Sequence, residues 1–328
     1  MMPAPRATSK LMPLWIGIAA VLIMPLAMRV LGLTLDNGTA VILFAMAAMG
    51  LNLLVGFTGL VSFGHAAWFG VGGYAAGLAQ KHFLPGQIIV PIVLAMLLVA
   101  VVSTVVGMLI LRRRGVYFSL LTLALSALTY AVAFRWTAVT GGEDGLGGLQ
   151  RGRLGPINFD DSAAYYTLVA GIAIAVLYGL MRVLNSPVGH VLVAIRENQQ
   201  RATFQGYAVD RYRLAAFVLS AVITGLAGAL FAFLHYLISA DATSVAFSGE
   251  LLAMAVIGGI HSVLGPALGA VFYLLFRELF SIWTGNWLFW FGVVFVAFVM
   301  YSPGGLVGIW SQLMRRWRPP PEESAAMS

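Results

Sequence analysis

Long apolar runs, separated by short polar segments, recur along the chain from Leu14 to Tyr301. A helix needs about 20 apolar residues to cross a hydrocarbon core of roughly 30 Å. These runs are continuous, unlike the short alternating segments of outer-membrane barrels. The pattern therefore predicts an all-α fold, a polytopic transmembrane helical bundle with about ten crossings, or about eight if one short pair forms a re-entrant hairpin. The crossings are predicted at 14–33, 40–56, 66–80, 88–111, 116–137, 164–184, 214–238, 249–260, 264–279 and 286–302.

Two of these segments, 66–80 and 249–260, are shorter than a usual span and are expected to be tilted, discontinuous or only partly inserted. The N-terminal run has the basic start of a secretory signal, but it is long and no small-residue cleavage site follows, so an uncleaved first span is expected. The predicted domains are an N-terminal tail at 1–13, a transmembrane domain at 14–317 and a disordered tail at 318–328.

Composition supports a lipid environment, because 60% of the 328 residues are hydrophobic and only 9% are charged, against roughly 25% charged in soluble domains. The chain has no cysteine, which excludes disulfides, cysteine-ligated metal centres and thiol catalysis. No two histidines show metal-ligand spacing on one helix, so neither a metal site nor a bound cofactor is expected.

The net charge of +7 does not indicate nucleic acid, because the basic residues gather between the apolar runs. With the N-terminus inside, most Lys and Arg fall on the inner face, at 6–10, 112–114, 182–213 and 315–318, and most acids fall outside. This bias follows the positive-inside rule and predicts that both termini are cytoplasmic.

The glycine-rich stretch 51–77 interrupts an apolar run with polar residues and a Phe-Thr-Gly-Leu break. Non-helical backbone at membrane depth is expected only against protein or a water-filled cavity, so the stretch is interpreted as part of a transport pathway. The candidate pathway residues are Asn52, Thr58, Ser62, Gly64, His65 and His261.

Two histidines within apolar surroundings, His65 and His261, leave two interpretations open. Each is a pathway or gate residue, or each caps a hairpin tip near the inner water interface. His65 directly follows Gly64, and His261 comes shortly after Gly258–Gly259. Both turns fall on the inner side of the predicted topology, which suggests an internal repeat. An intramembrane enzyme using Ser62 and His65 is disfavoured, because no orienting acid or oxyanion donor is evident.

Small residues recur four apart, as at Gly73 and Gly77, at Gly265 and Gly269, and at Ala221 and Gly225. This spacing lets membrane helices approach closely, and packing within the chain is preferred over a dimer seam.

The predicted outer loop 138–163 carries a glycine-rich stretch from Thr140 to Gly148. It lacks the spacing of a phosphate-binding loop, and its acids would repel phosphate. A tight cap over the pathway or a docking surface is expected. The residues concerned are Thr140, Gly141, Gly142, Asp144 and Gly145.

The predicted inner loop 185–213 has an apolar stripe at Val188, Val191, Leu192 and Ile195. It predicts a short amphipathic helix with Glu197 placed to pair with Arg201. The helix lies in the lipid headgroups or docks in a partner's groove, and the sequence does not separate these alternatives.

No energy source is encoded in the chain. Its two lysines, Lys10 and Lys81, do not follow glycine, so a phosphate-binding GxxxxGK[ST] loop is impossible. Its acids near the apolar runs, Glu250 and Glu278, fall at span ends, so none is predicted at mid-membrane. Uphill transport would need another subunit to supply the energy.

Five segments in order resemble the inner-membrane permeases of branched-chain amino acid ABC importers, most closely the LivM-type subunit. His190 and His261 depart from residues that are common in that family. The segments are LNLLVGFTGLVSFGHAAWFGVGGYAA (51–76), RRRGVYFSLLTLA (112–124), TGGEDGL (140–146), SPVGHVLVAIRENQQRATFQGY (186–207) and GGIHSVLGPALGA (258–270).

The resemblance implies a multi-pass permease domain in a bacterial inner membrane, without covalent chemistry of its own. It implies a homologous permease partner, two cytoplasmic ATPases that bind ATP and Mg²⁺, and a periplasmic binding protein that delivers leucine, isoleucine or valine. The family also includes permeases for urea, short amides and other amino acids; a stand-alone channel or secondary transporter is the remaining alternative. The ATPase-coupling residues that it implies are Gly189, Ala194, Ile195, Arg196, Glu197, Asn198 and Arg201.

Overall fold

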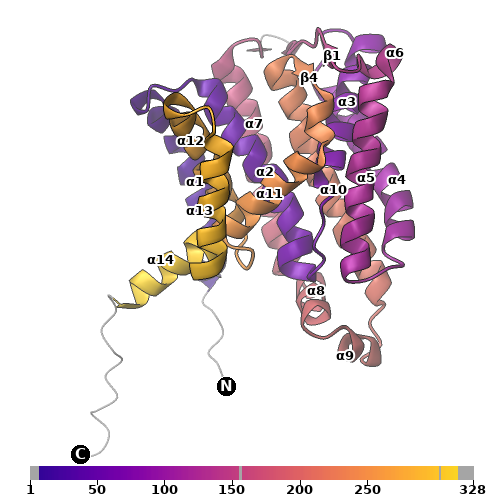
Figure 1. Cartoon of the computed structure of the whole chain (residues 1–328), viewed down its shortest axis with the longest axis vertical. Helices are drawn as coiled ribbons and strands as arrows, with labels where there is room; N and C mark the ends of the chain where they lie inside the picture. The colour runs from indigo at the N-terminus through magenta and orange to yellow at the C-terminus, as the bar shows by residue number, and fades with distance from the viewer. Residues whose placement is uncertain (1–6, 155–156, 303, 317–328) are drawn as a thin grey trace, which may run out of the picture.

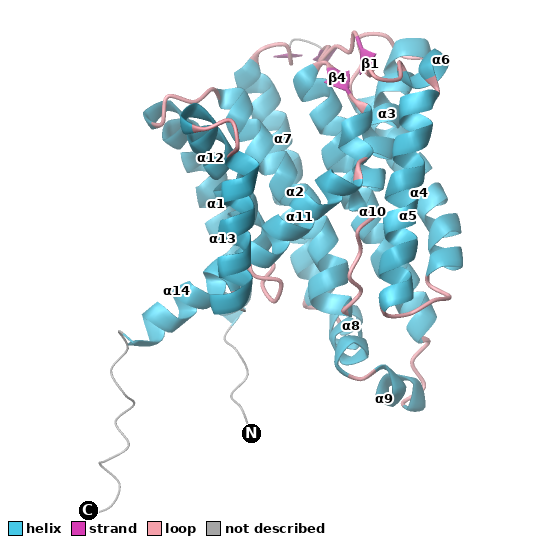
Figure 2. Cartoon of the chain, viewed as in Figure 1, coloured by secondary structure: helices cyan, strands magenta, loops and turns pink. Residues whose placement is uncertain are grey.

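The computed structural model describes residues 7–154, 157–302 and 304–316. Helices account for nearly all of its regular structure, as Figure 2 shows. The first half contains α1 (Ala7–Val30), α2 (Leu35–Thr58), α3 (His65–His82), α4 (Ile89–Ile110), α5 (Val116–Arg135) and α6 (Thr137–Thr140). The second half contains α7 (Ser162–Leu184), α8 (Pro187–Glu197), α9 (Gln199–Phe204), α10 (Val209–His235), the 3-10 helix η1 (Ala240–Thr243), α11 (Val245–Gly258), α12 (Gly265–Trp283), α13 (Trp287–Tyr301) and α14 (Gly305–Arg316).

Four two-residue strands complete the described part. β1 (Leu146–Gly147) pairs antiparallel with β4 (Leu237–Ile238), and β2 (Arg153–Leu154) pairs with β3 (Ile157–Asn158). The prediction of an all-α bundle is therefore confirmed, and each predicted crossing overlaps one helix.

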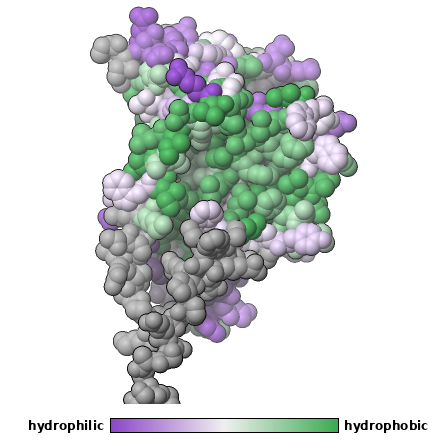
Figure 3. Space-filling model, turned by 90° about the vertical axis from the view of Figure 1, so that its left-hand side faces the viewer, coloured by the Kyte–Doolittle hydropathy of each residue, from purple (hydrophilic) through white to green (hydrophobic). Residues whose placement is uncertain are grey.

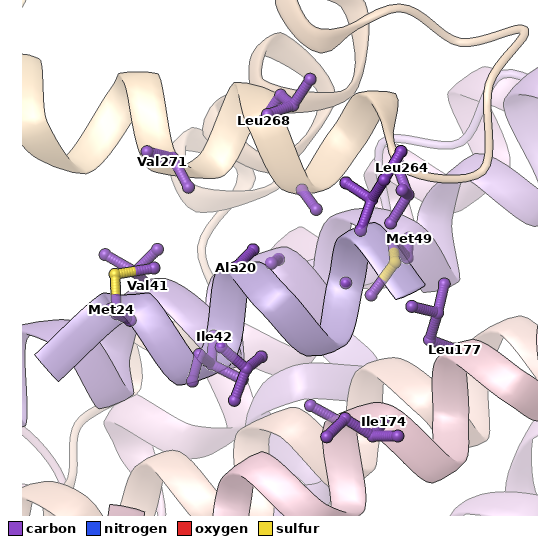
Figure 4. A pocket seen from close by; sticks show the side chains of 16 residues that line it. Ala20, Met24, Val41, Ile42, Met49, Ile174, Leu177, Leu264, Leu268 and Val271 are labelled. Carbon is purple, nitrogen blue, oxygen red and sulfur yellow. The ribbon is translucent and has the colours of Figure 1, made fainter. Parts of the chain in front are cut away.

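Seven helices are long and apolar enough to cross a membrane: α1, α2, α4, α5, α7, α10 and α12. The apolar helices α11 and α13 are shorter. Figure 3 shows a continuous apolar band between polar surfaces above and below it. The molecule is thus a multi-pass membrane protein.

The bundle has two ends, and side-chain contacts define each of them (Figure 1). At the β1 end, the starts of α2 and α4 meet the ends of α3 and α10, together with β1 and β4. At the α8 end, the finish of α2 meets α8 and the turn between α11 and α12. α1 starts near the α8 end, and α14 also lies there.

The helices form two sets of five that run in opposite directions. The first set, α1–α5, begins with α1 running toward the β1 end, and the direction alternates from helix to helix. The second set, α7 and α10–α13, begins with α7 running toward the α8 end and also alternates, so each helix runs opposite to its counterpart in the first set. In each set the second helix is long. It is followed by the extended stretch 59–64 and α3 in the first set, and by the stretch 236–244, extended apart from the 3-10 turn η1, and α11 in the second. Inverted repeats of this kind are common in transporters.

The internal repeat therefore exists, but it does not match Gly64–His65 with Gly258–His261. His65 begins α3 inside the bundle, whereas His261 is exposed in the turn after α11, at the α8 end. The prediction that both turns lie on the inner side is wrong for His65. The matching positions are the two extended stretches.

Glycines let α3 pass against α10, and α11 against α12, with their backbones in close contact. A Cβ on Gly72 would lie 2.1 Å from the Gly225 carbonyl oxygen, and one on Gly228 would lie 1.8 Å from that of Phe69. Between α11 and α12, a Cβ on Gly269 would lie 1.8 Å from the Met254 oxygen. These contacts confirm that the small-residue pattern serves packing within the chain.

One predicted boundary falls elsewhere. α1 begins at Ala7, so part of the segment assigned to an N-terminal tail at 1–13 is helical. The tail assigned to 318–328 lies outside the described residues. Trp68 is 1% exposed and packs edge-on against Phe217. Trp136 and Trp283 are exposed at helix ends, and Trp15 is exposed near the start of the apolar span Met12–Val30, as an interfacial belt requires.

Candidate functional site

The two short helices that follow the breaks at 59–64 and 236–244, α3 and α11, start next to each other in the middle of the bundle. The backbone N–H of Ala66, at the start of α3, donates to Ser248 Oγ on α11 at 2.9 Å. Ser126, halfway along α5, donates to the Thr243 carbonyl at 2.8 Å and lies 3.4 Å from Ser248 Oγ. Short helices thus start at mid-depth, where their first N–H groups need partners that lipid cannot supply.

Side chains of α5 satisfy the extended backbone before α3. Gly59 ends α2 in the left-handed conformation at φ 72°, which releases the chain from the helix. Ser119 then donates to the Val61 carbonyl at 2.7 Å, and the Phe63 N–H donates to Thr122 Oγ1 at 3.1 Å. A Cβ at Gly64 would lie 2.6 Å from the Thr122 carbonyl oxygen, so the close approach requires glycine there.

His65 is fully buried and links three elements by hydrogen bonds. Ser220 on α10 donates to the Gly50 carbonyl at 2.5 Å, so its oxygen accepts from His65 Nε2 at 2.7 Å. Nδ1 is then the acceptor for the Ser62 hydroxyl at 3.0 Å. This connectivity assigns the neutral Nε2–H tautomer.

His65 is therefore not a hairpin-tip residue at the inner interface. Ser62 and His65 are 1% and 0% exposed, and both hold the break in place. The second ring nitrogen meets a serine and not a carboxylate, so the pair lacks the orienting acid that a hydrolytic dyad needs.

The other pathway candidates lie toward the α8 end. Thr58 donates back to the Leu54 carbonyl at 2.6 Å, and Asn52 donates through Nδ2 to the Ser262 carbonyl at 3.0 Å. Asn52 Oδ1 is buried without a hydrogen-bond partner in the described structure. Asn52 thereby ties α2 to the α11–α12 turn.

Arg196, at the end of α8, connects both halves of the molecule. Its Nη1 donates to the Gly56 carbonyl in the last turn of α2 and lies 3.2 Å from Nδ1 of His261. Its stem covers Gly59, where a Cβ would lie 2.9 Å from Arg196 Cγ. One side chain therefore contacts the start of the first break and the turn that follows α11.

α8 itself is fixed by close packing against the end of α7. A Cβ on Gly189 would lie 2.2 Å from the Leu184 carbonyl oxygen, and Val191, Leu192 and Ile195 are buried. Ala194 is half-buried and accepts the Asn198 N–H at 3.0 Å. Val188, the first residue of the predicted stripe, is 40% exposed.

The predicted single helix is in fact two, because Asn198 has extended backbone angles and caps α9. Its side chain accepts the Arg201 N–H at 2.9 Å. Glu197 and Arg201 thus fall on different helices, and the predicted pair between them does not form. The Glu197 carboxylate instead lies 3.9 Å from Arg196, and both Glu197 and Arg201 are exposed.

The glycine-rich loop at the β1 end folds against β4. Thr140 is buried and donates to the Ala133 and Trp136 carbonyls. Gly141, Gly142 and Gly145 all have positive φ, and a Cβ on Gly145 would lie 2.5 Å from the Ile238 carbonyl oxygen. Asp144 is exposed. The loop therefore holds the extended stretch that leads into α11.

Arg151 is a buried cation that the sequence did not reveal. It is 1% exposed, donates to Asp36 at 3.3 Å and to the Leu234 carbonyl at 2.8 Å, and lies over the rings of Tyr165 and Tyr236. It joins the start of α2, the end of α10 and α7.

Residues 33–302 match the family model for the permease component of branched-chain amino acid transport systems. The chain belongs to this family. It is 26% identical over 298 residues to the high-affinity branched-chain amino acid transport permease LivM of Escherichia coli K12, covering 84% of this chain and 70% of the relative.

Two archaeal relatives extend the comparison with this permease family. A probable LivM of Methanocaldococcus jannaschii is 25% identical over 323 residues, covering 81% of this chain and 90% of the relative. A probable LivH of the same organism is 25% identical over 155 residues, covering 44% of this chain and 49% of that one. No solved structure matches the chain.

Proposed function

We propose that the chain is the membrane-spanning permease subunit of an ABC importer for branched-chain, hydrophobic amino acids. The observation that carries this proposal is the family match across 33–302. The curated LivM relatives are named for the same transport. Enrichment of basic residues at the α8 end supports placing that end and both termini in the cytoplasm of a bacterial inner membrane.

The energy would come from two cytoplasmic ATPases that bind ATP and Mg²⁺ themselves. The chain has no phosphate-binding loop, and the α8 end offers exposed polar residues for docking. The proposed coupling segment comprises Gly189, Ala194, Ile195, Arg196, Glu197, Asn198 and Arg201. Exposed Glu197 and Arg201 would contact the ATPase, while Arg196 contacts the bundle.

In this mechanism, closure of the ATPases displaces α8 as a rigid body. Arg196 transmits the displacement to Gly56, at the end of α2, and to His261, in the turn that follows α11. Because ATP binds the closed ATPase state more tightly, it shifts the permease between two conformations. The chain performs no covalent step.

The remaining partners would be a homologous permease and a periplasmic binding protein. The match to both LivM and LivH relatives supports a second permease of related sequence. The loop with Thr140, Asp144 and Gly145 is the proposed docking surface for the binding protein, since Asp144 is exposed there. Nucleic acid has no role in this assembly. Urea, short amides and other amino acids are the alternative substrates.

Uptake of radiolabelled leucine and urea tests the proposal in cells that lack their own leucine uptake systems. The cells produce this chain together with the proteins encoded beside it. Leucine uptake that needs both this chain and hydrolysable ATP is the expected result. Urea uptake without leucine uptake would overturn the substrate assignment, and uptake that survives loss of the ATPases would overturn the ABC assignment.

A further inference from the structure

Four helices gather charged and aromatic residues on one face toward the β1 end, away from the groups already described. On α11, Phe247 and Glu250 are three residues apart and share a side of the helix. Both are only partly buried. The Glu250 carboxyl faces the Tyr273 hydroxyl of α12, and Arg277, one turn further along α12, is near enough to stabilise its negative charge.

The same face continues onto α2 and α10. The ring centroid of Phe44 lies 5.7 Å from that of Phe231 and 5.6 Å from that of Phe247, so the three rings pack together. His235 lies 4.4 Å from the ring of Phe231, is exposed, and interacts with both Asp36 and Arg277. The three phenylalanine rings thus lie beside charged residues of both signs.

Glu250 lies at mid-depth, which corrects the sequence-based placement of this acid at a span end. Ser248, two residues earlier, contacts Ser126 halfway along α5 and Ala66 at the start of α3. Two helical residues rise about 3 Å, so Glu250 is close to the same level. The error arose because α11 starts at Val245, before the predicted 249.

A partly exposed carboxylate at this depth cannot face lipid without a cost of several kcal/mol. It must face protein or water. Figure 1 shows α11 crossing between the α12–α13 pair and the α5–α10 group. The ring contacts lead from Phe247 through Phe44 and Phe231 to exposed His235, the last residue of α10, and so toward the β1 end. Water that reaches Glu250 from the β1 end would also reach His235 and Arg277.

We propose that this face binds the amino-acid zwitterion on its way through the chain. Glu250 receives the substrate ammonium group, Arg277 receives the carboxylate, and the edges of Phe231 and Phe247 contact the branched side chain. A carboxylate and a guanidinium are the side chains that pair with these two groups. Arg277 is 37% exposed and is held by Glu278 at 3.2 Å, which leaves its other donors for the substrate. The inference rests on the proposed transport of amino acids.

Cysteine accessibility in the whole transporter tests the site, because the chain has no cysteine of its own. Phe247→Cys should react with a membrane-impermeant methanethiosulfonate reagent added from the side of the β1 end. Saturating leucine with the binding protein should slow that reaction at least about tenfold. Leu128→Cys is the control, because Leu128 is 62% exposed on α5 in the apolar band and should stay unreactive.

Leucine uptake supplies the second readout. Glu250→Gln should lower uptake about tenfold through loss of a charge-assisted contact, with Glu250→Asp partly restoring it. Asp160→Asn, an exposed acid just before α7 at the same end, should leave uptake unchanged.

The outcomes separate the two proposals. A wild-type complex that takes up no amino acid would overturn the proposed function. In a complex that does take up leucine, a Phe247→Cys variant as unreactive as Leu128→Cys would overturn this site alone. A reaction that leucine does not slow, or normal uptake by Glu250→Gln, would do the same.

Discussion

Arg196 Nη1 lies 3.2 Å from Nδ1 of His261, and this contact joins the short helix α8 to the turn that follows α11. The same nitrogen donates to the Gly56 carbonyl at the end of α2. Both inverted halves therefore meet at one guanidinium. In the proposed mechanism, a displacement of α8 would be transmitted to both halves.

Replacing Arg196 with alanine should uncouple the transporter. Leucine uptake should fall about tenfold or more, because one charge-assisted contact to each half is lost. ATP hydrolysis and membrane insertion should persist. Arg182→Ala is the matched control, since Arg182 is exposed at the same end and contacts only its neighbour Tyr178 among the interactions described. Normal uptake by Arg196→Ala would refute the coupling role.

Adding one methyl group where α3 crosses α10 should destabilise the fold. A Cβ on Gly228 would lie 1.8 Å from the Phe69 carbonyl oxygen, so the backbones must separate. We expect Gly228→Ala to cost about 1–3 kcal/mol and to lower the melting temperature in detergent.

Gly171→Ala gives the comparison, because it adds the same methyl to helix α7 with no atom within 4 Å. Its melting temperature should be unchanged or higher, since alanine favours the helix. Equal melting of the two variants would contradict the backbone contact between α3 and α10.

Arg151→Met should weaken the β1 end by about 3 kcal/mol. The change leaves Asp36 and two backbone carbonyls of α10 without their donor. Thermal unfolding in detergent measures the loss, and the exposed Arg153→Met is the control. If both variants melt alike, Arg151 does not hold α2, α7 and α10 together.

His65→Leu should destabilise the bundle without affecting pathway chemistry directly. The Ser62 hydroxyl loses its acceptor and the Ser220 oxygen loses its donor, at about 1–3 kcal/mol in total. His82→Leu, at an exposed position on the same helix, should be near neutral. A stable and fully active His65→Leu variant would show that the hydrogen-bonded chain through His65 is dispensable.

Apolar run length predicted the helices, because each crossing must satisfy its own backbone in lipid. It did not predict how deep in the membrane each break between helices lies. The sequence places Gly64–His65 between two apolar pieces, which fits a hairpin at the interface as well as a break at mid-membrane. Only the partners on α5 and α10, Thr122 and Ser220, decide between them.

Long-range contacts explain the other differences. The hydrogen-bond partners of Arg151 lie on helices more than 80 residues away in sequence, on α2 before it and on α10 after it, so no local pattern marks it. Glu250 was misplaced because an error of four residues at the start of a short helix moves an acid from mid-depth to a span end. The α8 stripe, in contrast, is local, and its buried face was predicted at Val191, Leu192 and Ile195.

The central claim is that this chain is a conduit without its own power source. Proteoliposomes containing the purified chain alone should not accumulate leucine against a gradient. Proteoliposomes with the permease partner, the ATPases, the binding protein and ATP should accumulate it. Accumulation by the chain alone would contradict the account.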